Sequence, residues 1–194
     1  MLYFHQRVMI TLITLAVAGM ILACLPSVPF ASGGPSAPCA VNISNQAADN
    51  FTKRIQQIKT SKGQAVTITV TSDELSSLLA QSLEAAKQSD PNVVVPIENP
   101  VICFQNGKMS VYAQVKTDAT NTINALISVR AAVSGGKVAF GVDQIQVGSF
   151  SLPKEVGDQV STLLNDALNQ NLAQINLVEI KIGNGQMTLT GRVQ

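Results

Sequence analysis

The sequence predicts an α+β fold: a long curved antiparallel β-sheet, built from a meander and a C-terminal hairpin, packed against two or three amphipathic helices. Three observations predict it. Apolar and polar residues alternate over long stretches in the middle of the chain, glycine-containing pairs interrupt the alternation at turn positions, and three other stretches repeat apolar residues with helical spacing. Hydrophobic residues make up 46% of the 194 residues, which is ample for a buried core.

Each helix carries its own signals. Ser44 is a suitable N-cap, and the apolar stripe that follows it runs from Ala47 to Ile58 and ends before Lys62-Gly63. Thr71 and Glu74 have capping-box spacing ahead of a leucine-rich face that stops before Asp90-Pro91. The third helix follows Pro153. Its apolar face is predicted to hold Val156, Val160, Leu163, Leu164, Ala167, Leu168 and Leu172, and its polar face Asp158, Gln159, Asn165, Asp166 and Asn169.

The strands are predicted from period-two alternation. A first strand covers 66–71, and Asn106-Gly107 is a two-residue hairpin signal between 101–105 and 109–117. Alternation over 123–133 leads to a turn at Gly135-Gly136. The next strand, 138–147, changes phase halfway, which predicts a β-bulge near Asp143-Gln144. Residues 180–182 and 187–193 flank Gly183-Asn184-Gly185 as a C-terminal hairpin.

The N-terminus has the pattern of an export signal. Residues 8–25 carry no charge and follow Arg7, and the run ends Ile21-Leu22-Ala23-Cys24, which resembles a lipobox with Cys24 as the lipid attachment site. Eighteen residues can also form a short transmembrane helix, and an ordinary cleaved signal is a third possibility. We therefore expect residues 1–23 to be a signal peptide or membrane anchor, 24–43 a flexible tether, and 44–194 a single domain outside the cytoplasm, anchored to the cell membrane.

Two cysteines remain in the expected exported part besides Cys24. Cys39 and Cys103 form an even pair in an oxidising compartment, which suggests a disulfide closing a loop of 65 residues. On the chain-entropy model such a bridge is worth about 4 kcal/mol. The alternative is two buried free thiols, because cysteine is among the residues most often buried.

Composition argues against several classes of function. Thirteen basic and twelve acidic residues provide no basic field for nucleic acid. The only histidine is His5, in the leader, so a mature chain lacks imidazole for catalysis or zinc binding. We expect no enzyme activity, no catalytic residue, no metal and no cofactor. The carboxylates are predicted to be scattered over polar faces: Asp73, Glu74, Asp118, Asp143, Glu155 and Asp158.

The order of these elements resembles a known family. Residues 66–79, 107–115, 138–153 and 180–191 resemble the LmeA-like phospholipid-binding proteins of the bacterial envelope and the similar YpmS-like membrane-anchored proteins. The resembling stretches are packing and turn signatures, not catalytic motifs. The resemblance implies a tubular lipid-binding (TULIP-like) fold, in which a long helix lies in a curved sheet and lipid occupies the gap.

The resemblance also implies a partner, a phospholipid or a related acyl or isoprenyl lipid held in an apolar groove, with the membrane reached through the N-terminus. No protein partner is identified. The groove lining we expect is Val111, Val115, Ile127, Val129, Val138 and Phe140 from the sheet and Leu164 and Leu168 from the helix. The alternative is an envelope interaction or assembly protein whose core is full, because a dry core and a lipid groove have the same composition and differ only in a cavity.

Overall fold

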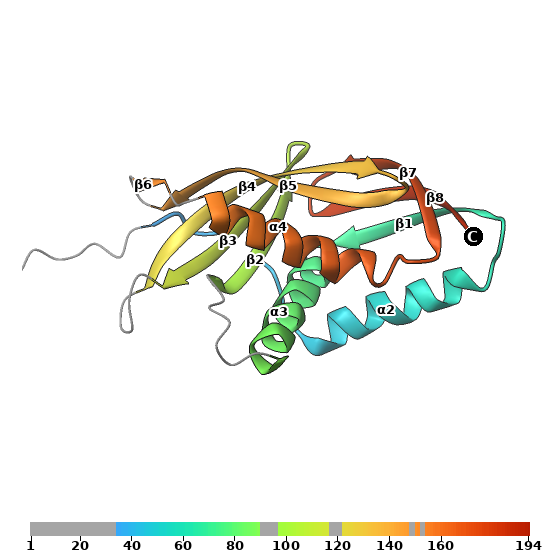
Figure 1. The fold of residues 1–194 in the computed structure, drawn as a ribbon, viewed down its shortest axis with the longest axis horizontal. Helices are drawn as coiled ribbons and strands as arrows, with labels where there is room; N and C mark the ends of the chain where they lie inside the picture. Colours follow the sequence, from blue (N-terminus) through green and yellow to red (C-terminus); the bar gives the residue numbers. More distant parts are fainter. Residues whose placement is uncertain (1–33, 90–96, 117–121, 148–149, 152–153) are drawn as a thin grey trace, which may run out of the picture. The chain divides into compact units, whose positions relative to one another are not determined.

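Three helices and two antiparallel sheets are present in the part of the chain that the computed structural model describes, residues 34–89, 97–116, 122–147, 150–151 and 154–194 (Figure 1). The coarse α+β prediction is confirmed. The elements are α2 (Asn45–Lys59), β1 (Ala65–Thr71), α3 (Ser72–Ser89), β2 (Ile97–Gln105), β3 (Lys108–Lys116), β4 (Thr122–Ser134), β5 (Lys137–Val147), β6 (Phe150–Ser151), α4 (Lys154–Asn169), β7 (Ile175–Ile182) and β8 (Gln186–Val193).

Within these ranges no helix has both the length and the hydropathy needed to cross a bilayer.

The meander forms a five-stranded sheet in the order β2-β3-β4-β5-β6. The β2–β3 and β4–β5 turns have the positive φ angles that the sequence predicts, 52° at Asn106 and 74° at Gly107 in the former and 57° at Gly135 and 76° at Gly136 in the latter. Ser128 pairs with Gln144 and Val129 with Val142, so Asp143 is the extra residue of a β-bulge. The predicted bulge is therefore confirmed, and it keeps both halves of β5 facing the core.

The C-terminal hairpin does not extend the meander, which corrects the expectation of one continuous sheet. β7 and β8 join β1 in a separate three-stranded sheet of order β1-β8-β7. Ile68 pairs with Leu189 and Val70 with Met187. A hairpin presents the same alternating pattern to any neighbour, so the sequence pattern alone could not show which strand β8 would join.

Local capping bonds begin the first two helices where the sequence places them. Ser44 caps α2 by accepting a hydrogen bond from the backbone N–H of Ala47. At α3 the capping box is complete: the Glu74 N–H donates to the Thr71 hydroxyl at 3.2 Å, and the Thr71 N–H donates to the Glu74 carboxylate at 3.0 Å. Both predicted helix starts are confirmed.

The segment expected to be a flexible tether contacts the domain in its second half. Asn42 donates its backbone N–H to Asp73 at 3.1 Å, and Gly34 lies directly against Asn124. Cys39 and Cys103 are joined in a disulfide with their Cα atoms 5.9 Å apart, an ordinary separation for such a bond. The expected signal or anchor (1–23) and Cys24 lie outside the described residues.

Candidate functional site

The residues nominated for a lipid groove all belong to one hydrophobic core, which also includes buried residues of α2, α3 and the three-stranded sheet. They come from three neighbouring strands and one helix, and none is more than 6% exposed: Val111, Val115, Ile127, Val129, Val138, Phe140, Leu164 and Leu168. The side chains that would line an open groove are therefore packed against one another in this conformation. The structure brings the nominated residues together, as core residues under a helical cover.

Polar side chains of α4 bind the backbone of β5. Asn169 accepts from the Val138 N–H at 3.1 Å and donates to the Val138 carbonyl at 2.8 Å. Asn165 makes the same pair of bonds with Phe140, at 2.8 and 3.2 Å, and Ser161 accepts from the Val142 N–H at 3.1 Å. We call these five bonds the Ser161–Asn165–Asn169 ladder. It occupies the edge of β5 that has no neighbouring strand over residues 138–142.

The spacing of the ladder follows from the two regular structures. Every fourth residue of a helix advances about 6 Å along its axis, and every second residue of a strand advances about 6.6–6.8 Å. Positions 161, 165 and 169 therefore match positions 142, 140 and 138 of an antiparallel strand, rung by rung. Figure 1 shows α4 lying along β5. The polar side chains supply the hydrogen bonds that a further strand would otherwise make.

This ladder corrects the sequence-based assignment of the helix faces. Asn165 and Asn169 were expected on the solvent-facing side of the third helix, but both are half-buried against β5. The i,i+4 spacing of serine and asparagine was the available signal. An amphipathic pattern separates apolar from polar side chains, and it does not distinguish a polar side chain in water from one that covers a sheet edge.

The close approach between α4 and β5 also depends on a glycine, Gly157, which has no side chain to separate them. Gly157 is buried in α4, and a Cβ placed on it would lie 3.2 Å from Cγ1 and 3.4 Å from Cβ of Val142. That is tight contact for any larger residue. A glycine inside a helix costs about 1 kcal/mol relative to alanine, so its presence here is explained by packing against β5.

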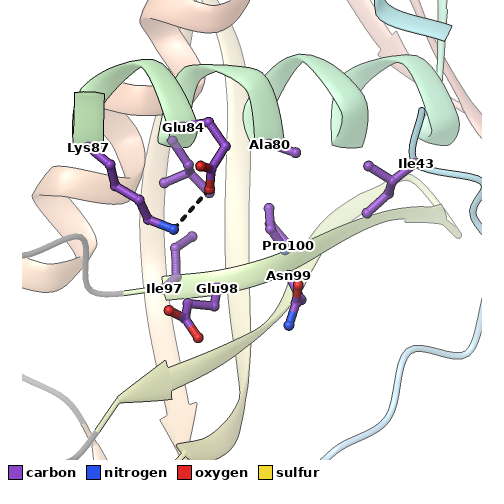
Figure 2. Close-up of a pocket in the computed structure, with 9 residues that line it drawn as sticks. Ile43, Ala80, Glu84, Lys87, Ile97, Glu98, Asn99 and Pro100 are labelled. Atoms are coloured by element: carbon purple, nitrogen blue, oxygen red, sulfur yellow. Dashed lines mark hydrogen bonds and ion pairs between the residues drawn. The ribbon is translucent and has the colours of Figure 1, made fainter. Parts of the chain in front are cut away.

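A second candidate site is a surface groove between α3 and the first residues of β2, with a volume of about 340 Å³. Figure 2 shows Glu84 and Lys87, an ion pair at 2.9 Å, on the helix side and Ile97 and Pro100 on the strand side. Ile43, which is 39% exposed, stands at the far end. The charged side chains Glu84, Lys87 and Glu98 line one end of this groove, so it lacks the charge-free lining expected of an acyl-chain site.

Four of the six carboxylates named from the sequence form hydrogen bonds or ion pairs with other groups in the structure. Glu74 is only 7% exposed, which corrects the expectation that it lies on a polar face, and it binds Arg54 through two bonds of 2.8 and 3.1 Å. Asp73 accepts from the backbone of Asn42, and Asp143 pairs with Arg130. Asp158 pairs with Lys154, and this hydrogen bond and charge raise the pKa of Lys154 above its ordinary value. Glu155 is exposed, and Asp118 lies outside the described residues.

Arg54 has a further role that sequence reasoning missed. Its guanidinium also donates to the Thr69 carbonyl of β1 at 2.7 Å and stands 5.5 Å from the centre of the Phe51 ring. The capping box pointed to Glu74, but its partner comes from another helix twenty residues earlier. Within the described residues, no three acidic, histidine or cysteine side chains gather in a way that could hold a metal ion.

Comparisons with protein-family models, with curated proteins and with solved structures found no match. The resemblance to the LmeA-like and YpmS-like proteins therefore stays a prediction from the sequence.

Proposed function

We propose that this protein is a non-enzymatic, membrane-anchored protein outside the cytoplasm that binds a phospholipid or a similar acyl-chain lipid between α4 and the five-stranded sheet. The observation that carries the proposal is the construction of this region. The apolar face of the five-stranded sheet is covered by α3 on the β2 side and by α4 along β5, and the described hydrogen bonds that attach α4 to β5 all come from side chains of the helix. The proposed arrangement is the tubular lipid-binding one, with a long helix lying in a curved sheet.

The energetics of acyl chains suit a carrier or sensor. An acyl chain gains about 0.8 kcal/mol for each CH₂ group that leaves water. It gains nearly the same amount in a bilayer, so an apolar protein site competes with the membrane almost evenly. Lipid can then be both loaded and released, provided that the lining is apolar and uncharged. The eight nominated residues, six from the sheet and two from α4, meet that condition because each is aliphatic or aromatic.

Native mass spectrometry of the full chain tests the proposal. The chain is purified from membranes in mild detergent, which is removed in the gas phase. We expect a mass increment of one phospholipid on the folded protein, in addition to any lipid attached covalently to Cys24. Repeated spectra without a phospholipid increment, from preparations that contain membrane lipid, would contradict the proposal.

A matched pair of tryptophan variants tests the location. The sequence contains no tryptophan, so an introduced one is the sole indole reporter. Phe140→Trp places it beneath α4, whereas Tyr112→Trp places it on the opposite face of the sheet, because Val111 and Ala113 on either side point into the core. Phospholipid brominated on its acyl chains should quench Phe140→Trp strongly and Tyr112→Trp weakly. Equal quenching would place the lipid elsewhere.

One observation favours a second candidate function, an envelope interaction or assembly protein that takes no ligand. The eight nominated residues are 0–6% exposed, as they would be in a permanently filled core. The two candidates differ in what a polar substitution does. In a permanent core it lowers stability only, whereas in a lipid site it also lowers lipid uptake by the protein that remains folded.

A further inference from the structure

We propose that α4 is a lid, and that an acyl chain enters by release of the Ser161–Asn165–Asn169 ladder from β5. This inference rests on the lipid-binding function proposed above and specifies how that site opens. It addresses a physical difficulty: the residues that would contact lipid are buried, so some element must move before a ligand can reach them.

The attachment of α4 differs in kind from strand pairing. Each rung joins a helix side chain to the backbone N–H, and for the two asparagines also the backbone carbonyl, of one strand residue, and the rungs are half-buried. When the helix moves away, water can reach both partners and replace each bond, so the net loss per bond is small, about 1 kcal/mol. Strand pairing would instead hold the edge through a continuous backbone ladder. The contact can therefore open without unfolding the sheet.

The surface beneath α4 is suited to an acyl chain. Val160, Leu164, Ala167 and Leu168 form the buried side of the helix, and Val138 and Phe140 are the core-facing side chains of the strand it covers. The same strand residues also provide the backbone groups of two rungs. Release of the ladder and exposure of the apolar strand face are therefore one event, and a lipid chain that replaces the helix contacts restores the apolar burial.

Gly157 makes a direct test possible. A Cβ at this position would lie 3.4 Å from the Val142 Cβ, close to the separation of about 3.5–4.5 Å found in disulfides. The double variant Val142→Cys/Gly157→Cys should therefore form a disulfide that fastens α4 to β5. The double variant Val142→Ser/Gly157→Ser is the matched control, because it carries side chains of similar size at both positions without the lock.

The experiment measures uptake of added phosphatidylglycerol by the full chain in mild detergent, followed by native mass spectrometry. We expect the locked variant to take up lipid at least about tenfold more slowly than the serine double variant. Equal uptake by the locked variant and the serine double variant would overturn the lid. Absence of uptake by the unmodified chain would instead overturn the proposed function, and the lid with it, so the two failures are distinguishable.

A second variant and a second measurement keep the proposal testable if the lock does not form. Asn165→Ala/Asn169→Ala removes four of the five bonds and should speed lipid uptake about tenfold. Amide hydrogen exchange at Val138, Phe140 and Val142 should be accelerated as well. Ala139 and Gly141 point their N–H groups towards β4 and should keep their rates. Unchanged uptake together with unchanged exchange would overturn the proposal.

Discussion

The two edges of the five-stranded sheet are covered in different ways. At the β2 edge, the Ile102 N–H donates to Ser76 of α3 at 2.8 Å in a buried bond, the Phe104 carbonyl accepts from Gly185 at 2.8 Å, and Cys103 is bonded to Cys39. At the β5 edge, the described attachments of residues 138–142 to α4 are half-buried side-chain bonds. A covalent bond and a buried bond hold one edge, and bonds that water can replace hold the other. The proposed opening therefore lies at the β5 edge.

The largest expected effect concerns the covalent bond at the β2 edge. Removing it with Cys39→Ser/Cys103→Ser frees a loop with a sequence separation of 64 and should lower the free energy of unfolding by about 4 kcal/mol. Urea unfolding of both proteins measures the change. A difference below about 1 kcal/mol would mean that the disulfide contributes little to the contrast between the edges.

The second-largest expected loss of stability comes from a substitution in the interior of the sheet, between the two edges. Ile127→Asn places an amide where the isoleucine is 0% exposed, and we expect a loss of about 3 kcal/mol from the unpaired polar group and the lost apolar burial. Ile123→Asn, in the same strand but 37% exposed, is the control and should cost less than about 0.5 kcal/mol. Urea unfolding of both variants gives the difference. Reduced lipid uptake by folded Ile127→Asn supports a lipid site, whereas normal uptake identifies permanent core.

A matched pair of serine substitutions compares the two edges directly. Ser76→Ala leaves the Ile102 N–H buried without a partner and should cost about 2 kcal/mol. Ser161→Ala leaves the Val142 N–H where water can reach it and should cost only about 0.5 kcal/mol. Thermal and urea unfolding under identical conditions give both values. Equal losses would contradict the proposed difference between a fixed edge and a releasable one.

The last prediction concerns the Asn165 rung of the ladder, whose expected effect is smaller than that of Ser76→Ala. Asn165→Ala removes two bonds to Phe140 and should lower stability by about 1 kcal/mol. It should also raise the exchange rate of the Phe140 amide relative to that of Ala139. Asp166→Ala, an exposed neighbour on the same helix, is the control and should change neither quantity. Identical exchange in both variants would show that Asn165 does not hold the helix to the strand.

Much of the fold could be predicted because its signals are local. The capping box at Thr71 and Glu74, the Asn106-Gly107 turn and the bulge at Asp143 each depend on residues close in the chain. The membership of the groove-lining set was also predictable, since alternation assigns side chains to faces. Whether that set lines an open groove was not predictable. The space between helix and sheet is filled or open depending on how closely α4 approaches β5.

The sequence by itself determined the elements, their turns and caps, and the inward faces of the strands, because these follow from backbone preferences and period. Only the tertiary structure decided that β8 joins β1, that Arg54 meets Glu74, and that Asn165 and Asn169 bind β5. Each of these pairings depends on groups from different elements meeting in space. The sequence does not show whether a polar side chain will form its hydrogen bond with water or with a peptide group that is distant in the chain.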